Sequence, residues 1–294
     1  MTTNWKRIMI CLDLSAIDDA VVAFGVKLLS SLPKPEAVCL VHNVRYDFKK
    51  LEQTFTQKQV LELKDRIRKH LHKTYQTAFK PLDIAVEISV SDDNSTTQAI
   101  MNAANAQSTD VILMGKKIPE EGAGIVPQKL LTADLKKTPI FLVPSSFSFR
   151  FERLVGGVDA SATFMPVSRT SKQLSHCFGA NKQLVHVYKE PVLYFPYFDG
   201  FNQEKIDNNI KEKVRAEFRD LAFNQTDLAT SELAAVHLVK GSHTGHALIA
   251  YCHKTEADLL VIARIGKTNL VGSTMGGVTR TMLSKATEFV VCIL

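Results

Sequence analysis

Long apolar segments are missing from this 294-residue sequence. Its apolar runs are short, such as Ile8–Leu12 and Leu259–Ala263, whereas a membrane-spanning helix needs about 18 or more apolar residues. The segment Met1–Arg7 also lacks the apolar stretch and the cleavage site of a secretory signal peptide. We therefore expect a protein without membrane association that stays in the compartment where it is made.

Paired cysteines are missing as well. The five cysteines stand singly, with no C-x-x-C spacing, at Cys11, Cys39, Cys177, Cys252 and Cys292. Several lie in β-branched runs, where a thiol behaves as a small hydrophobic side chain. An odd number of cysteines without the spacing of a disulfide framework indicates a reducing compartment, so we expect a cytoplasmic protein.

The sequence also has little concentrated charge. Its net charge is only +6, and the densest basic stretch, Lys64–Lys73, belongs to a predicted amphipathic helix. The apolar side of that helix carries Val60, Leu63, Ile67 and Leu71. We expect its cations to form a solvated outer face. Aromatic residues do not alternate with them as in a base-stacking surface, so no nucleic-acid partner is expected.

What the sequence does contain is a repeat. Apolar residues make up 45% and charged residues 22% of the chain, as in globular proteins, and the length predicts two domains. The two halves match in the same order. The matching segments are Ile10–Ser15 with Gly156–Ser161, Val41–His42 with Val185–His186, Thr109–Gly115 with Ala257–Ala263, and Thr138–Phe141 with Thr287–Val290. A tandem duplication follows, with domains at 1–147 and 148–294 and a seam near Pro144–Arg150.

Each half alternates short apolar runs with helical patterns. We predict strands at 7–13, 37–43, 84–90, 110–115 and 139–143, and again at 153–158, 183–188, 233–239, 258–263 and 288–293. In the first half, helices are predicted at 16–31, 57–79, 95–106 and 127–136. Apolar strands separated by helices are typical of a parallel sheet covered on both faces. The sequence therefore predicts an α/β protein with two doubly wound, five-stranded parallel sheets in tandem.

Ligands of such sheets bind at the carboxyl ends of the strands, where each half carries an aspartate. Asp13 and Asp159 follow the first predicted strand of their halves, each two residues before a serine. A carboxylate there can accept hydrogen bonds from sugar hydroxyls or an exocyclic amine. The alternative is an N-cap of the following helix, provided by the aspartate or by Ser15 and Ser161.

A glycine-bearing loop, Ala263–Gly277, follows the fourth predicted strand of the second half. Such a loop before a helix N-terminus can bind an anion, because free N–H groups and the helix dipole both favour negative charge. Arg264 and Lys267 can add charge, and hydroxyls come from Ser273, Thr274 and Thr279. The alternative is an ordinary flexible connection. The loop is neither a Walker A motif nor a dinucleotide fingerprint.

Together, several segments resemble the universal stress protein family. These are Val155–Ser161, Leu184–Val187, Ala257–Ala263 and the Ala263–Gly277 loop, with Arg7–Asp13 and Asp110–Gly115 in the first half. The resemblance covers nearly the whole chain as a tandem pair. It implies the adenine-nucleotide-hydrolase-like fold in each half, and it implies ATP as a ligand.

The ATP-binding members of that family carry the pattern G-x-x-G-x(9)-G-[S/T]. In the second half this pattern falls on Ala263, Gly266, Gly276 and Gly277, so only the second and third positions keep their residue type. The missing hydroxyl at Gly277 removes one phosphate donor, worth about 1–2 kcal/mol. The resemblance also assigns Asp159 to the nucleoside and the backbone of Val187 to adenine, which leaves a weakened site.

The first half departs further from the pattern. Gly115 keeps the first glycine, but Ile118 holds the second position, and Gln128 and Lys129 replace the last pair. The preceding Pro127 offers no N–H. Within this loop, Glu120 and Glu121 would repel a triphosphate, and Asn43 stands where the other half has Val187. We expect Asp13 and Gly115 to mark a degenerate site, and the first domain to be a structural partner without a cofactor.

Other chemistry finds less support in the residues. Gly156–Ser161 also resembles the S-G-G-x-D-S loop of ATP pyrophosphatases, but the serines do not match. His243 and His246 have no third ligand at a familiar spacing, so no metal site is expected. His42 and His186 lie in predicted strands and are expected to be packed. No paired acid and base is found, and we expect no catalytic residue.

The functional expectation is a cytoplasmic tandem universal stress protein that acts as a regulatory module in the stress response. Its second domain would bind ATP or a related adenine nucleotide, with or without Mg²⁺, and hydrolyse it slowly at most. The two domains would form an intramolecular pseudo-dimer through the strands Pro139–Val143 and Phe289–Ile293. The sequence does not decide whether the chain forms further homo-oligomers. The protein partner is not identified by the sequence. The alternative is a relative that has lost nucleotide binding and acts only through protein contacts.

Overall fold

The structure, a computed structural model, describes residues 5–44, 55–117, 125–133, 138–146, 150–189, 203–224, 235–266, 275–285 and 288–294. The chain divides into two compact units, Met1–Phe149 and Arg150–Leu294, called here the first and the second unit. Within the described ranges no helix combines the length and the apolarity that crossing a membrane requires.

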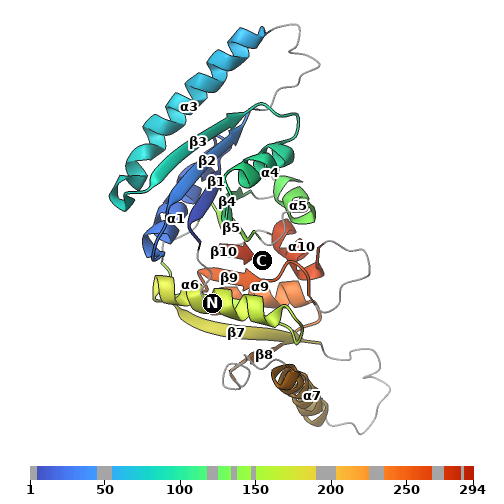
Figure 1. Ribbon diagram of the computed structural model, residues 1–294. Helices are drawn as coiled ribbons and strands as arrows, with labels where there is room; N and C mark the ends of the chain where they lie inside the picture. Colours follow the sequence, from blue (N-terminus) through green and yellow to red (C-terminus); the bar gives the residue numbers. More distant parts are fainter. Residues whose placement is uncertain are drawn as a thin grey trace. The chain divides into compact units, whose positions relative to one another are not determined.

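The first unit is a parallel sheet with helices on both faces (Figure 1). Its elements are β1 (Arg7–Cys11), α1 (Ile17–Ser31), β2 (Ala37–Asn43), α3 (Gln57–Phe79), the short 3-10 helix η1 (Lys80–Leu82), β3 (Ala85–Ser91), α4 (Thr96–Ala106), β4 (Val111–Lys116), α5 (Ile125–Thr132) and β5 (Ile140–Pro144). The strand order is β3-β2-β1-β4-β5. In Figure 1, α1 and α3 lie on one face and α4 and α5 on the other. The sheet is thus doubly wound, as predicted.

The second unit repeats this arrangement. Its elements are β6 (Arg153–Gly157), α6 (Phe164–Phe178), β7 (Asn181–Tyr188), α7 (Gln203–Asn224), β8 (His237–Lys240), α9 (Thr244–Lys254), β9 (Leu259–Ile262), α10 (Gly277–Ser284) and β10 (Val290–Ile293). The strand order is β10-β9-β6-β7-β8, with parallel pairing. The predicted order of strands and helices is confirmed in both units, and only the ends of elements differ.

Apolar strands and close helix contacts form the core. Every residue of β2 is buried, as the near-continuous apolar run predicts. Helix α1 lies so close to the sheet that a Cβ on Gly25 would be 2.5 Å from Cδ1 of Ile10. Phe141 is fully buried and meets the rings of Trp5 and Phe24 with centroids 5.8 and 5.4 Å apart. Burial of such a ring contributes about 1.5–3 kcal/mol.

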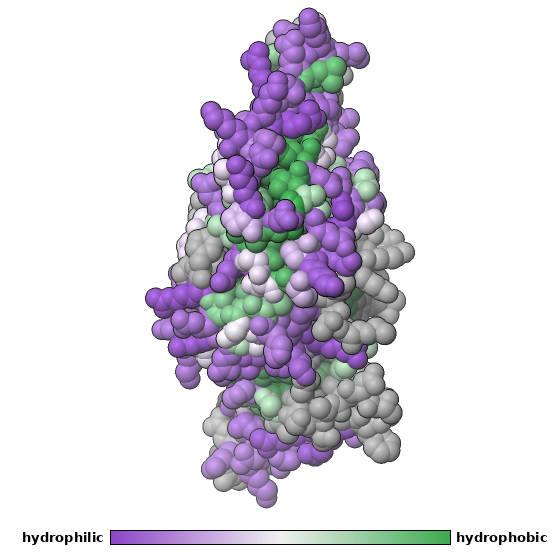
Figure 2. All heavy atoms as spheres, turned by 60° about the vertical axis from the view of Figure 1, so that its left-hand side comes forward, coloured by the Kyte–Doolittle hydropathy of each residue, from purple (hydrophilic) through white to green (hydrophobic). Residues whose placement is uncertain are grey.

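Helix α3 has the solvated basic face that its sequence pattern predicts. Asp65 and Lys69 form an exposed ion pair of 2.8 Å on it, and the surface in Figure 2 is mostly hydrophilic with a narrow hydrophobic band. The apolar side is less covered than predicted. Leu71 is buried, whereas Leu63 is 37% exposed. The C-terminal half of α3 therefore provides most of its packing.

The first strand of the first unit ends earlier than predicted. The sequence predicts 7–13, but β1 ends at Cys11. The carboxylate of Asp18, in the first turn of α1, accepts hydrogen bonds from the N–H groups of Asp13 at 3.1 Å and Leu14 at 2.8 Å. Leu14 has a φ of 62°, which a strand cannot accommodate. The chain therefore leaves the sheet just before the aspartate of interest.

Candidate functional site

The topology places one candidate region in each sheet. From β6 the chain continues to β7 and β8 on one side and later to β9 and β10 on the other. The carboxyl ends of β6 and β9 therefore flank the switch point, where ligands of doubly wound sheets bind. Asp159 follows β6 and Ala263 follows β9. The equivalent strands of the first unit are β1 and β4.

Asp159 lies directly against the glycine loop. A Cβ built on Gly266 would be 2.8 Å from Oδ2 of Asp159, so only a glycine fits without moving the carboxylate. The other oxygen, Oδ1, accepts hydrogen bonds from the hydroxyls of Ser161 at 2.5 Å and Thr163 at 3.0 Å. These bonds fix the orientation of the carboxylate beside the backbone of the loop.

The two ends of the glycine loop meet. The N–H of Gly276 donates to the carbonyl oxygen of Arg264 at 2.9 Å, and a Cβ on Gly276 would lie 3.2 Å from that oxygen. The buried Thr279 donates its hydroxyl towards the carbonyls of Arg264 and Ala263 at 3.0 and 3.3 Å. The predicted residues Ala263, Gly266 and Gly276 are thus brought together. Lys267, Ser273 and Thr274 lie outside the described residues.

The N-terminus of α10 faces the same place. Its N-cap is Gly276, which has no side chain to accept from the first helical N–H groups. Gly277 follows as the first helical residue, and a Cβ built on it would meet nothing within 4 Å. Unsatisfied N–H groups and the positive end of the helix dipole favour an anion. The helix begins one residue before the predicted Val278.

The backbone of Val187 points towards the switch point. Val158 N donates to Val185 O at 2.9 Å on one side of β7, and Gly241 N donates to Tyr188 O at 3.1 Å on the other. Backbone groups of alternate residues in a strand point to the same side. Val187 therefore directs its N–H and C=O to the same side as Val185, beyond the last residue of β6, Gly157.

In the first unit an internal cation lies against the equivalent aspartate. Lys117, just after β4, forms an ion pair of 2.5 Å with Oδ2 of Asp13. Oδ1 accepts from the hydroxyl and the N–H of Ser15 at 2.5 and 3.2 Å. Burial alone would raise the pKa of Asp13, but the hydrogen bonds from Lys117 and Ser15 and the charge of Lys117 outweigh it and lower the pKa. Both oxygens are engaged within the unit.

The other first-unit residues have structural roles. A Cβ on Gly115 would lie 2.8 Å from Cγ2 of Ile17, so the close packing of α1 against β4 requires this glycine. The side chain of Asn43 accepts from Asp93 N at 2.9 Å and Ser91 Oγ at 2.8 Å, and donates to Asp93 O at 3.0 Å. Asn43 thereby holds the loop between β3 and α4. Of the predicted loop, Ile118, Glu120 and Glu121 lie outside the described residues.

The aspartates do not cap their helices. The N-caps are Ala16 in α1 and Thr163 in α6, neither with a side-chain cap, so the N-cap interpretation of Asp13 and Asp159 is wrong. The hydroxyl of Ser161 does accept a hydrogen bond from Thr163 N at 3.2 Å, in the turn before α6. Sequence reasoning also missed Thr163 and Lys117. A signal for Lys117 was present, because the alignment of the halves places it opposite Ile265, next to the second glycine position.

The strand histidines are packed, as predicted. His42 Nδ1 lies 3.0 Å from Leu12 O, and His186 Nδ1 lies 2.8 Å from Val158 O. Each imidazole thus binds the carbonyl just before the aspartate of its unit and supports the loop that carries it.

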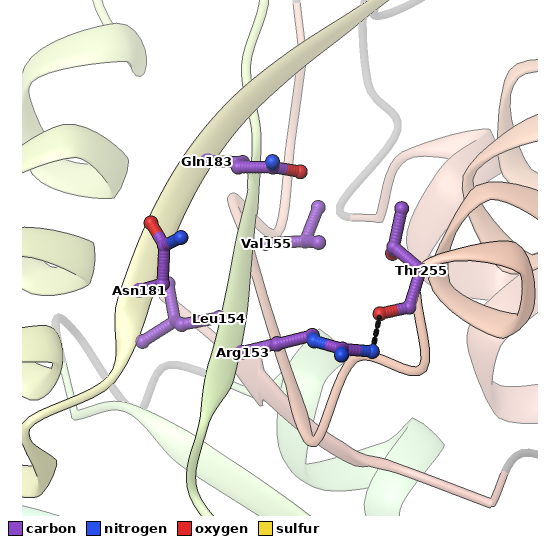
Figure 3. A pocket seen from close by; sticks show the side chains of 6 residues that line it. All are labelled: Arg153, Leu154, Val155, Asn181, Gln183 and Thr255. Atoms are coloured by element: carbon purple, nitrogen blue, oxygen red, sulfur yellow. Dashed lines mark hydrogen bonds between the residues drawn. The ribbon is translucent and has the colours of Figure 1, made fainter.

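The remaining motifs have packing explanations. Gly156 and Gly157 belong to β6 itself, and a Cβ on Gly156 would be 2.7 Å from Ser171 Oγ and from Leu184 Cδ2. These glycines are therefore not a phosphate loop of the pyrophosphatase kind. Among the described residues, no group of three or more His, Cys, Asp or Glu side chains could hold a metal ion. A cavity in this unit lies elsewhere, at the amino ends of β6 and β7 (Figure 3).

Solved structures with the same fold span the whole chain, although no protein-family model and no curated protein matches it. A universal stress protein from Archaeoglobus fulgidus DSM 4304 is 14% identical, with a TM-score of 0.60 over 100% of this chain and 98% of that chain. A candidate universal stress protein from Pseudomonas aeruginosa UCBPP-PA14 is 13% identical, with a TM-score of 0.63 over 99% and 94%. The chain therefore has the fold of the universal stress proteins, in two tandem copies.

Proposed function

We propose that this chain is a tandem universal stress protein that binds ATP or a related adenine nucleotide in its second unit. The observation that carries the proposal is the contact between Gly266 and Asp159 beside the N-terminus of α10. It combines a carboxylate for the nucleoside with backbone N–H groups for the phosphates. The backbone of Val187 would take the adenine edge.

Two departures from the family pattern make the proposed site weak. The methyl group of Ala263 stands where ATP-binding members have a glycine, and Gly277 lacks the hydroxyl. The space beside Gly277 is open, so the missing group is a lost hydrogen bond and not an obstruction. Mg²⁺ would be held mainly by the phosphates of the nucleotide, as is usual for this ion.

The proposed role is regulatory. The hydroxyls of Ser161 and Thr163 orient Asp159, and we propose that it binds the nucleoside and that ATP hydrolysis is slow at most. A change in the glycine loop on nucleotide binding would be read by a protein partner in the stress response. The first unit would act as a structural partner in an intramolecular pseudo-dimer in the cytoplasm, and this proposal does not depend on further self-association of the chain.

Nucleotide selectivity tests this function. Isothermal titration of the nucleotide-stripped full chain should give saturable ATP binding with magnesium present and weaker GTP binding. GTP binding as tight as ATP binding would contradict the role of Val187. An absence of ATP binding at millimolar concentration would favour the alternative, a relative that acts only through protein contacts because the changes at Ala263 and Gly277 have abolished nucleotide binding.

A further inference from the structure

A cavity of the second unit lies at the amino-terminal ends of the strands, whereas Asp159 follows the carboxyl end of β6. The cavity opens at the amino ends of β6 and β7, beside the end of α9, and has a volume of about 240 Å³ (Figure 3). Its lining consists of Arg153, Leu154, Val155, Asn181, Gln183 and Thr255. Pockets for drug-sized ligands measure about 300–1,000 Å³, so this cavity suits a smaller molecule.

The duplicated fold offers an internal comparison for this cavity. Arg7 N donates to Asp110 Oδ2 at 2.9 Å in the first unit, and Arg153 N donates to Asp258 Oδ2 at 2.9 Å in the second. The two arginines are therefore equivalent, each at the start of the first strand of its unit.

In the first unit one edge of the guanidinium group of Arg7 is occupied by residues of that unit. Arg7 Nε donates to Gln107 O at 2.6 Å, and Nη2 donates to Gln107 Oε1 and Glu87 Oε1, both at 2.9 Å. The edge of the guanidinium formed by Nε and Nη2 thus meets an amide and a carboxylate of its own unit.

In the second unit both partners are replaced by smaller residues. Thr255, the C-cap of α9, stands where Gln107 caps α4. Glu87 lies opposite Cys39 in β2, and Val41 lies opposite Ser89. Because Val185 lies opposite His237, counting back two residues makes Ala235, which precedes β8, the counterpart of Glu87. Thr255 lines the cavity.

Arg153 lines the cavity with a half-exposed side chain. Its Nη1 donates to Thr255 O at 2.9 Å and Glu256 Oε2 at 2.8 Å, and Figure 3 shows the side chain reaching across to Thr255. Among the described residues, none accepts a hydrogen bond from Nε or Nη2. This is the edge that binds a carboxylate with two parallel hydrogen bonds.

The neighbouring groups add donors and an apolar wall. Gln183 Oε1 accepts from the hydroxyl of Tyr251 at 2.9 Å, so its amide NH₂ remains as a donor. Val155 is 1% exposed, lines the cavity and lies between Gln183 and Arg153 in Figure 3. A ligand here would need an acceptor group and a short apolar body.

We propose that this cavity binds a small organic carboxylate, whose carboxylate group takes the place that Glu87 occupies in the first unit. The guanidinium of Arg153 provides the main contact, the amide of Gln183 a second donor, and Val155 the apolar contact. This site is separate from the proposed nucleotide site and does not depend on it.

Propionate is a suitable probe, titrated into the ¹⁵N-labelled full chain. The Nε–H signal of Arg153, assigned with Arg153→Lys, should shift in a saturable way that sodium chloride at equal ionic strength does not reproduce. ATP at saturating concentration should leave the propionate titration unchanged. A linear shift, the same shift with chloride, or tighter binding of inorganic phosphate would overturn the proposal.

Two variants introduce the partners of Arg7 from the first unit at the corresponding positions of the second unit. Ala235→Glu returns the carboxylate and Thr255→Gln returns the amide, and each should weaken propionate binding about tenfold or more by competing for the guanidinium. Glu87→Ala, in the first unit, is the matched control and should leave the Arg153 titration unchanged. Circular dichroism verifies that the variants fold, and one folded variant is enough to test the site. Unaltered propionate affinity in a folded Ala235→Glu or Thr255→Gln protein would refute the site.

Discussion

Lys117 Nζ lies 2.5 Å from Oδ2 of Asp13 in the first unit, whereas the aligned position in the second unit is Ile265. One duplicated aspartate is therefore neutralised by a lysine of its own unit, and the other, Asp159, lies against Gly266 in the glycine loop. The asymmetric function proposed for the two copies rests on the contact of Asp159 with Gly266 beside the N-terminus of α10. The difference between the two aspartates also provides matched pairs of variants.

Replacing Gly266 by alanine should weaken ATP binding about tenfold or more. The new Cβ would lie 2.8 Å from Oδ2 of Asp159, so the carboxylate must move from its binding position, and a lost charge-assisted hydrogen bond is worth about 1.5–3 kcal/mol. Calorimetric titration measures the change. Gly277→Ala is the control, because its Cβ meets nothing within 4 Å. Equal losses in both variants would argue against the contact as the cause.

Restoring the family pattern should strengthen binding. Gly277→Ser adds a phosphate donor in open space, and combining it with Ala263→Gly removes the methyl group from the loop. We expect ATP affinity to rise about tenfold, equivalent to about 1.4 kcal/mol. Unchanged or weaker affinity in the folded double variant, measured in the same calorimetric assay, would show that these two positions do not contact the nucleotide.

The buried carboxyl group of Asp18 should contribute more to the stability of the first unit in mild acid than at pH 7. Burial, which outweighs the N–H bonds from Asp13 and Leu14, raises the pKa of Asp18 to about 6 from its ordinary 3.8. Between these values the folded state binds more protons than the unfolded state, so this contribution to stability grows as pH falls from 7 towards 4.

Urea unfolding at pH 7 and pH 5 measures that effect by difference. When the pH falls from 7 to 5, the free energy of unfolding should change less favourably in Asp18→Asn than in the wild type. The variant should gain less stability than the wild type, or lose more. Because other carboxyl groups titrate equally in both proteins, the difference isolates Asp18. An identical pH dependence in the two proteins would contradict the raised pKa.

The sequence predicted the fold well because its signals are local. Apolar periodicity and the repeat suffice to locate the strands along the sequence. The order of the strands in the sheet, which the structure provides, brings Asp159 and Gly266 to one switch point. Contacts that depend on loop conformation were not predictable. The ion pair of Lys117 with Asp13 requires the path of the chain after β4, and the packing of Gly115 on Ile17 requires the helix position.

The cavity at Arg153 was likewise beyond sequence reasoning. The register of β8 and the C-cap of α9 make Ala235 and Thr255 the counterparts of Glu87 and Gln107 in the first unit. Only the two aligned sheets identify these residues as counterparts.

The most direct test of the asymmetric account is ATP titration of the stripped protein with Asp159→Ala and Asp13→Ala side by side. We expect micromolar binding at about one site per chain, abolished by Asp159→Ala and unchanged by Asp13→Ala. Binding that survives Asp159→Ala, or that depends on Asp13, would contradict the assignment of the nucleotide to the second unit.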